Sequence, residues 1–487
     1  MRQGVRRLIF DDKEKLPLAQ LDPAEVIGLS TMFPVKDHGA EKANVSINDE
    51  QLVIEAGQEA ETSIWLSGFN PFATYSLDLA LSQKNTSIGF EFANDARDTR
   101  FIVAVHDNGE RISDVRQMII KNGDTLYNES IATASAGKQS LKGKLLVQLF
   151  GSGLTVFVQQ NGLPVAVGQS EFSDKIDLRK KEYMHALHSS IYVKQQAGEV
   201  RIHGAEVAIT TGLGQADIRA ITYEDGSPLL EEGRLWYTMS IRGRALPHHL
   251  QGVFSLDPTV FDLKMEGVIL FDRNDGLLRN EIASHIFYDR KAKQWRGLTT
   301  GFSAFASDDE EKQLLAVSSD RDPRFGFSVM HAEPFGIVGD IEDPHILYDA
   351  DVNKWRILTC AHYDGYKAVI LESDTWNKDY TTIAGPVAHN STGTSIQAIG
   401  GKRYCFSGSA EREIFIYSYP ELEEVGTLQM NLPPWDDRAG TRVWPNVVEL
   451  PDGYPFKYVA LMMDRHNYPG LEGNHWTYGA LYLYHGM

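Results

Sequence analysis

Cysteine is almost absent from the sequence, whose 487 residues include two, Cys360 and Cys405. Two thiols form no disulfide framework, and neither stands in a CxxC context, so both are expected to be small buried side chains in a reducing compartment. Long hydrophobic runs are absent too, because no stretch of about 18 apolar residues occurs. The first residues, MRQGVRRLIFDDKEK, turn from basic to acidic without an apolar core. No secretory signal is therefore predicted, and a cytoplasmic location is expected.

Basic residues are too few to balance the acidic ones, since 47 Lys and Arg stand against 66 Asp and Glu, for a net charge of −19. This charge opposes binding to nucleic acid or to an anionic membrane, so neither partner is predicted. Established metal spacings are also missing. His248-His249 has no partner at a zinc spacing, and Phe271–Gly276 resembles a calcium loop without its terminal Glu. No metal and no cofactor is predicted, and the oligomeric state is left open.

Long amphipathic helices are the third absence, and strand patterns take their place. Residues 1–40 have little periodicity and are expected to form an N-terminal arm. Residues 41–212 contain alternating segments such as Tyr75–Leu79. Within them, Leu145–Phe150 and Leu154–Val158 have the pattern of a hairpin. Strands at this spacing without helices predict a two-sheet β-sandwich, and the segment is similar to a concanavalin-type jelly roll.

An internal repeat organises the rest of the chain. His285–Thr299, HIFYDRKAKQWRGLT, returns sixty positions later as His345–Thr359, HILYDADVNKWRILT. A period of about fifty to sixty residues with several strands per unit is typical of propeller blades. Residues 213–487 divide into five blades of about fifty-four residues, so an all-β chain ending in a five-bladed β-propeller is predicted. The inner strands are expected at Ile218–Tyr223, Ile282–Tyr288, Asp343–Tyr348, Thr394–Ile399 and Val443–Leu450.

The third predicted blade contains the most specific pattern. Glu342-Asp343-Pro344 opens its inner strand, Lys354-Trp355 follows at the hairpin, and a Ser-Asp-Thr-Trp cluster at 373–376 closes the blade. This pattern resembles the five-bladed propeller glycoside hydrolases, both the invertase and levansucrase group and the arabinanase and xylosidase group. The resemblance implies a sugar pocket at the centre of the ring and cleavage of a glycosidic bond.

The resemblance also implies roles for particular carboxylates. Asp343 is expected at the pocket, where it orients the sugar and tunes the acid. Hydrolysis needs a further carboxylate as base or nucleophile and a proton donor with a raised pKa. Glu281, after Asn280, stands in for the aspartate of an invertase-like Asn-Asp-Pro, although the register is shifted because Ala283 lies sixty residues before Asp343. Asp217, at the start of blade one, is the alternative base.

The proton donor is left unassigned by the sequence. The families have a Glu on the inner strand of blade four, where this chain has HNSTGT from His389 onward, without a carboxylate. His389 is one candidate, because imidazole is a competent acid near neutral pH. Glu411 or Glu413, from the following hairpin, is another. Glu342 adjoins Asp343, but neighbouring residues of a strand are expected to point to opposite faces.

Arginines near the starts of the inner strands suggest what the pocket binds. Arg219 and Arg442 are predicted ligands, since a guanidinium fork binds a carboxylate bidentately and would fit an acidic sugar such as a uronate. The alternative is that these arginines pair with acidic residues of the chain. His345, His389 and Trp444 complete the predicted binding set as stacking and hydroxyl partners of a sugar ring.

The predicted function is that of a glycoside hydrolase that removes a terminal sugar from an oligosaccharide or a polysaccharide fragment. Two other classes stay open. A non-catalytic carbohydrate-binding propeller would explain the missing acid in blade four. A polysaccharide lyase would use His389 as a base and Arg442 to neutralise a uronate carboxylate.

Overall fold

Strands dominate the computed structural model of the chain, as the sequence predicted. It describes residues 6–9, 38–39, 42–49, 51–81, 84–243, 248–302, 310–409, 412–428, 444–463, 468, 470–471 and 481–487. In these residues the helices are the short α2 (Lys181–Ala186) and the 3-10 turn η1 (Ala136–Lys138), and no helix among them is long and apolar enough to cross a membrane. Two compact units divide the chain. The sandwich unit is Gly4–Thr210 with Pro469–Leu471, and the propeller unit is Met1–Gln3, Thr211–Tyr468 and Glu472–Met487.

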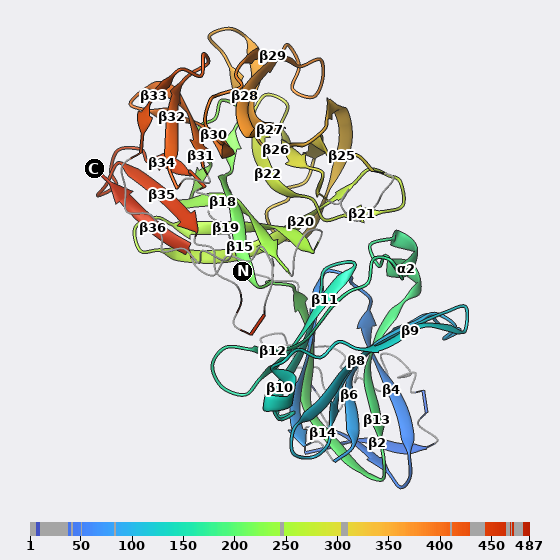
Figure 1. Cartoon of the computed structure of the whole chain (residues 1–487). Helices are drawn as coiled ribbons and strands as arrows, with labels where there is room; N and C mark the ends of the chain where they lie inside the picture. Colours follow the sequence, from blue (N-terminus) through green and yellow to red (C-terminus); the bar gives the residue numbers. More distant parts are fainter. Residues whose placement is uncertain are drawn as a thin grey trace, which may run out of the picture. The chain divides into compact units, whose positions relative to one another are not determined.

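The sandwich unit consists of two antiparallel sheets (Figure 1). Alternate residues of each strand face inward, so Leu77 from one sheet and Phe90 from the other join a single buried apolar core. The first sheet has the order β12-β11-β10-β5-β14-β3-β2, with β1 paired to β14. Its strands are β1 (Arg6–Ile9), β2 (Ala43–Asn48), β3 (Gln51–Ala56), β5 (Ala73–Leu81), β10 (Gly143–Leu149), β11 (Gly153–Gln159), β12 (Val165–Glu171) and β14 (Gly198–Ile209). The second sheet, in the order β4-β13-β6-β7-β8-β9, contains β4 (Ala60–Gly68), β6 (Thr86–Ala93), β7 (Arg100–Asp107), β8 (Ile112–Lys121), β9 (Asp124–Ser130) and β13 (His188–Gln195).

The propeller unit is a ring of five blades that follow one another along the chain, which confirms the predicted propeller (Figure 1). Neighbouring strands within a blade are antiparallel, and the outermost strands of blades one and two pair in parallel, which joins these two blades in one sheet. Blades one to four have four main strands, and blade five has three within the described residues. Contacts between the inner strands of successive blades, and between β15 and β35, close the ring. Blade one is β15 (Gly214–Ala220), β18 (Arg234–Arg242), β19 (His249–Asp257) and β20 (Asp262–Asp272), and blade two is β22 (Ile282–Asp289), β23 (Gln294–Thr300), β24 (Gln313–Ser319) and β25 (Gly326–Val338). Blade three is β26 (Ile341–Asp349), β27 (Lys354–Tyr363), β28 (Gly365–Ser373) and β29 (Thr381–Ala384), blade four is β30 (Thr392–Ile399), β31 (Lys402–Gly408), β32 (Ile414–Ser418) and β33 (Glu424–Thr427), and blade five is β34 (Val447–Glu449), β35 (Tyr458–Met463) and β36 (Leu481–Gly486). The short strands β16 (Thr222–Tyr223), β17 (Leu230–Glu231) and β21 (Leu278–Arg279) complete the unit.

The repeated segment forms the inner hairpin of blades two and three, β22-β23 and β26-β27. In each copy the Asp that ends the inner strand pairs with the Arg that follows the Trp, at 2.5 Å in Asp289–Arg296 and 2.9 Å in Asp349–Arg356. The first residue of the repeat joins blades, because His285 accepts a 3.0 Å hydrogen bond from the backbone N–H of Ile346. The repeated Asp–Arg pair therefore stabilises both hairpins, and His285 fixes blade two to blade three.

A bulge at the start of the inner strand recurs in four blades. The pairing register shifts there, and one residue adopts the left-handed backbone conformation that L residues seldom take. These equivalent residues are Asp217 (φ 54°), Ala283 (φ 55°), Asp343 (φ 61°) and Gly393 (φ 60°). The bulges of blades one and three therefore each carry a carboxylate. The bulge of blade two carries the methyl group of Ala283, and that of blade four, at Gly393, has no side chain.

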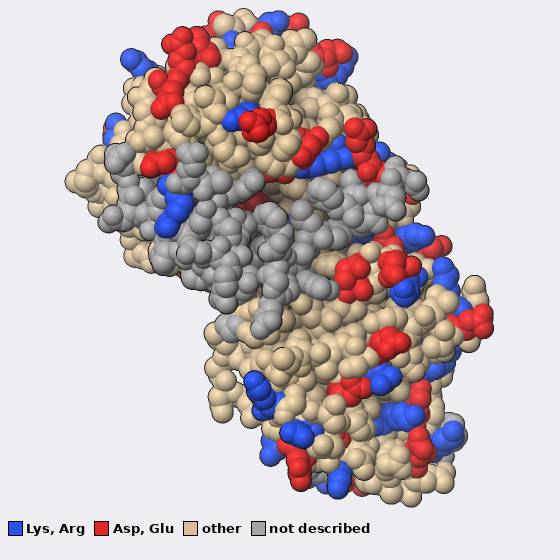
Figure 2. Space-filling model, in the orientation of Figure 1, with Lys and Arg blue, Asp and Glu red and all other residues tan. Residues whose placement is uncertain are grey.

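Surface charge is mixed on the face of the molecule drawn in Figure 2. Lysine and arginine side chains are interspersed with aspartate and glutamate on the described part of that face.

Candidate active site

Asp343, at the start of the inner strand of blade three, is fixed by two neighbouring strands, β23 and β30. Its backbone N–H donates to Thr300 Oγ1 at 3.2 Å, and its carbonyl oxygen accepts from Thr394 Oγ1 at 2.6 Å. The carboxylate Oδ2 accepts a 2.8 Å hydrogen bond from the backbone N–H of Gly393. Asp343 is 3% exposed, so contacts with blades two and four determine where this side chain points.

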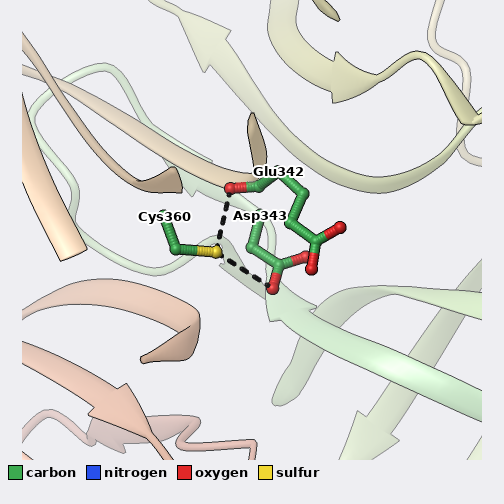
Figure 3. Close-up of side chains that lie close together, drawn as sticks. All are labelled: Glu342, Asp343 and Cys360. Carbon is green, nitrogen blue, oxygen red and sulfur yellow. Dashed lines mark hydrogen bonds between the residues drawn. The ribbon is translucent and has the colours of Figure 1, made fainter. Parts of the chain in front are cut away.

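Glu342 lies on the same side as Asp343, which corrects the expectation that the two would point apart (Figure 3). The cause is the bulge, because a residue with φ 61° breaks the two-residue alternation of a strand. One carboxylate oxygen from each residue and the sulfur of Cys360 all lie within 4.8 Å of one another. The Cys360 thiol contacts the carbonyl oxygen of Glu342 at 3.4 Å and Asp343 Oδ2 at 3.8 Å.

The surroundings of Asp343 favour its protonated form. Burial, followed by the negative charges of Glu342 and Asp217, raises the pKa of Asp343 to about 7. The Arg219 guanidinium and the Gly393 N–H act in the opposite direction but do not cancel this effect. A carboxyl group with this pKa is half-protonated near neutral pH and can donate a proton.

Asp217 occupies the same bulge position in blade one and has a different partner. Arg242 Nη2 donates to Asp217 Oδ2 at 2.7 Å, and both side chains are buried. Glu281 is buried as well, two residues before the bulge residue Ala283, and its negative charge is one of the causes that raise the pKa of Arg279. Of the two candidate bases, only Asp217 therefore has the position in its blade that Asp343 has in blade three.

Arg219 and Trp444, two of the predicted sugar ligands, are occupied by the propeller itself. Arg219 Nη2 donates to the carbonyl oxygen of Asp343 at 2.9 Å, and Nη1 donates to the carbonyl oxygen of Thr394. Burial lowers the pKa of Arg219 to about 10. Trp444 Nε1 donates to the carbonyl oxygen of Ile218 at 2.6 Å. Arg219 links blade one to blades three and four, and Trp444, just before β34, is hydrogen-bonded to blade one. Both side chains are therefore engaged within the propeller.

The predicted histidines separate into two environments. His345 is buried and stacks on His285 with ring centroids 4.0 Å apart, and burial holds its pKa well below the usual range, so it is neutral. His389 is turned toward the outer strands of blade four, where it stacks on Phe415 and lies 3.0 Å from Glu424 Oε2. The His389 side chain thus contacts β32 and β33, and its role in a sugar pocket stays a prediction that these contacts do not favour.

Arg442 and Glu411 lie outside the described residues. Glu413 is exposed, and its backbone N–H donates to Ser409 Oγ at 3.3 Å in the turn before β32.

Sequence reasoning missed the cations that neutralise the acids. Arg242 comes from the end of β18, and Lys312 precedes β24 in blade two. Lys312 Nζ lies 2.7 Å from Glu342 Oε2 and 2.7 Å from Asp340 Oδ1. Each cation is distant in sequence from its acid and belongs to no motif, so no local signal could have revealed it.

A metal ion is the other group that acidic side chains could hold. Within the described part of the chain, Glu342, Asp343 and Cys360 are the one set of His, Cys, Asp or Glu side chains close enough to bind one. Both carboxylates already have protein donors, Lys312 for Glu342 and the Gly393 N–H for Asp343. We therefore assign no metal to this cluster.

No family model and no curated protein matches the chain. Similar solved structures include both groups that the pattern of blade three resembles. They are RS223 beta-xylosidase (12% identity, TM-score 0.40, 56% of this chain and 93% of that one), Bacillus subtilis levansucrase (11%, 0.37, 56% and 84%), and CoXyl43, a GH43 beta-xylosidase/alpha-arabinofuranosidase from a compost microbial metagenome (13%, 0.38, 57% and 92%). Because these TM-scores are below 0.5, the blade count and the site rest on this chain's own strands and contacts.

Proposed function

We propose that the chain is a glycoside hydrolase whose working carboxyls are Asp343 and Asp217. The observation that supports the proposal is the matched pair of bulges, which carry one aspartate at the start of the inner strand of blade one and one at the start of that of blade three. The negative charge of Asp217 acts on Asp343. The two have different surroundings: Asp217 is ion-paired, whereas Asp343 has a raised pKa. Two carboxyls in environments that separate their protonation states are what glycoside hydrolysis requires.

In this proposal Asp343 donates a proton to the oxygen of the scissile glycosidic bond. Asp217 serves as the base that activates water or as the nucleophile that attacks the sugar. The Arg242 guanidinium holds Asp217 in place, and a negative carboxylate stabilises an oxocarbenium-like centre. The anomer released first distinguishes the two roles, because inversion requires a water between sugar and base and retention requires a covalent intermediate.

The substrate we propose is a neutral oligosaccharide that loses a terminal sugar. Among the cations near Asp217, Glu342 and Asp343, the Lys312 ammonium group is already paired with Glu342 and Asp340 and is not offered to an anionic sugar. The described arginines close to them are engaged, Arg219 by carbonyl oxygens and Arg242 by Asp217. An acidic glycan, suggested by the arginine pattern of the sequence, is thus the less favoured substrate.

A carbohydrate-binding propeller without activity is the second candidate, and two observations favour it. Asp343 and Asp217 are 3% and 5% exposed, and blade four has Gly393 where a further acid would be expected. A lyase is less favoured, because its proposed base, His389, is directed to the outer strands of its blade.

The test is an incubation of the full chain with a panel of neutral and uronate-containing oligosaccharides. Matched variants are Asp343→Asn, Asp217→Asn and, as a control, Asp374→Asn, which removes an exposed ion pair with Lys354. Products are separated by anion-exchange chromatography, and ultraviolet absorbance reports any unsaturated lyase product. A saturated monosaccharide released by the wild type and the control, but not by the other two variants, supports the proposal. Sugar binding without cleavage supports the binding propeller.

A further inference from the structure

One ammonium group is held beside the carboxyl pair by residues of blade three. Lys312 Nζ lies 2.7 Å from Glu342 Oε2, 2.7 Å from Asp340 Oδ1 and 3.0 Å from the Tyr366 hydroxyl. The Tyr366 hydroxyl itself donates to Asp340 Oδ1 at 2.5 Å. The Lys312 side chain is 9% exposed, although it comes from blade two. Such a network fixes both the place and the charge of the ammonium group.

The two adjacent carboxyls, those of Glu342 and Asp343, have different hydrogen-bond and ion-pair partners. Glu342 receives the cation directly, whereas the carboxylate of Asp343 receives the neutral Gly393 N–H and the Cys360 thiol. Arg219 contacts Asp343 through its carbonyl oxygen rather than its carboxylate. A cation in contact favours the ionised form of a carboxyl, and burial favours the neutral form.

We propose that Lys312 is a positioning residue that decides which of the two neighbouring carboxyls, Glu342 or Asp343, carries the proton used in bond cleavage. This inference rests on the proposed function, in which Asp343 is the donor. With Lys312 present, the cation is in contact with Glu342 and not with the carboxylate of Asp343, which favours the proton on Asp343. Without Lys312, the half-buried Glu342 has lost its cation and competes with Asp343 for the same proton.

The other charged groups facing Asp343 are unchanged by a substitution at Lys312. From blade one these are Asp217, with its partner Arg242, and Arg219. From β27 the neighbour is the Cys360 thiol. A change in the titration of Asp343 after replacing Lys312 therefore reports the Lys312–Glu342 pair.

The experiment compares pH profiles of kcat/KM for Lys312→Met, Lys312→Arg and Glu342→Gln. Loss of the cation in Lys312→Met is expected to move the alkaline limb up by about one pH unit and to lower the plateau about tenfold. Glu342→Gln removes the negative neighbour and is expected to move the limb the opposite way. Lys312→Arg keeps the charge and is expected to retain the wild-type limb, as is the control Lys354→Met, which breaks the exposed pair with Asp374.

Opposite shifts in two variants cannot arise from partial unfolding. An alkaline limb in Lys312→Met that coincides with the wild-type limb overturns the inference, whatever the plateau. Infrared titration of protonated carboxyl groups, with Asp343→Asn assigning the band, measures the same proton without a substrate. A titration midpoint of this band that lies at higher pH in Lys312→Met than in the wild type supports the inference, even if no sugar is cleaved. The absence of cleavage would count against the proposed function alone. A band that does not move overturns the inference.

Discussion

The backbone N–H of Gly393 donates a 2.8 Å hydrogen bond to the carboxylate of Asp343, so the bulge of blade four holds the acid of blade three. Gly393 has φ 60°, and a side chain there would meet the ring of Trp444 at 2.7 Å. Trp444 in turn donates to the carbonyl oxygen of Ile218 in blade one. Gly393 thus connects the candidate acid of blade three with Trp444, which is bonded to blade one. Only a residue without a side chain fits at this position.

Gly393→Ala is expected to destabilise the chain by about 2 to 4 kcal/mol, because a Cβ both strains the left-handed backbone and collides with Trp444. Chemical denaturation monitored by tryptophan fluorescence measures this change in the free energy of unfolding. Gly57→Ala is the matched control, since nothing lies within 4 Å of a Cβ at that position. Equal stability of the two variants would contradict the packing described.

Asp343→Asn is expected to make the chain more stable at pH 8 than the wild type. Folding raises the pKa of Asp343 to about 7, above the unfolded value of about 3.9. The folded state therefore binds the proton more tightly, and wild-type stability falls as pH rises from about 4 to about 7. The amide of Asp343→Asn does not titrate. The free energy of unfolding of this variant should therefore exceed that of the wild type by an amount on the order of 2 kcal/mol or more at pH 8, and the difference should vanish near pH 4.

Unfolding free energies of the wild type and Asp343→Asn across this pH range check that prediction. Asp349→Asn would not serve as a control, because Asp349 binds Arg356, Arg403 and Tyr419. Asp374, exposed and paired with Lys354, is the suitable position. A difference between wild type and Asp343→Asn that is the same at pH 5 and pH 8 would refute a raised pKa.

Arg242→Met is expected to cost about 3 to 5 kcal/mol, because it leaves Asp217 buried without its counterion. The double variant Arg242→Met/Asp217→Asn should recover most of this loss, since both charges are then gone. A double-mutant cycle of unfolding free energies isolates the coupling. Additive effects of the two substitutions would show that the 2.7 Å ion pair contributes nothing to stability.

The fold was predictable where the sequence repeats itself. The copies at His285 and His345 gave the blade period, and three of the five expected inner strands coincide closely with β22, β26 and β30. The expected strand at Ile218–Tyr223 overlaps only the end of β15 (Gly214–Ala220) and the short β16. The expected strand at Val443–Leu450 is shorter, with β34 at Val447–Glu449 and Val443 outside the described residues. Apolar strands separated by turns leave a strong pattern because each blade must bury both faces.

The site was predictable only in part, because bulges and long-range pairs leave no periodic signal. Asp343 could be chosen from its motif, but a two-residue alternation put Glu342 on the wrong face. Glycine adopts the left-handed backbone conformation readily and aspartate tolerates it, so it is unsurprising at Gly393 and Asp217. Alanine rarely adopts it, so the sequence does not predict it at Ala283. Lys312 and Arg242 come from strands far along the chain, so only the folded ring brings them to their acids.

Initial rates for the wild type, Asp343→Asn and Asp217→Asn on one cleaved oligosaccharide test the central claim most directly. Both variants are expected to fold and to lose about 10²-fold to 10⁴-fold in kcat, since each removes one of the two working carboxyls. A wild-type profile that falls with an apparent pKa of about 7 on the alkaline side would match the carboxyl of Asp343. A folded Asp343→Asn variant that cleaves at the wild-type rate would contradict the account.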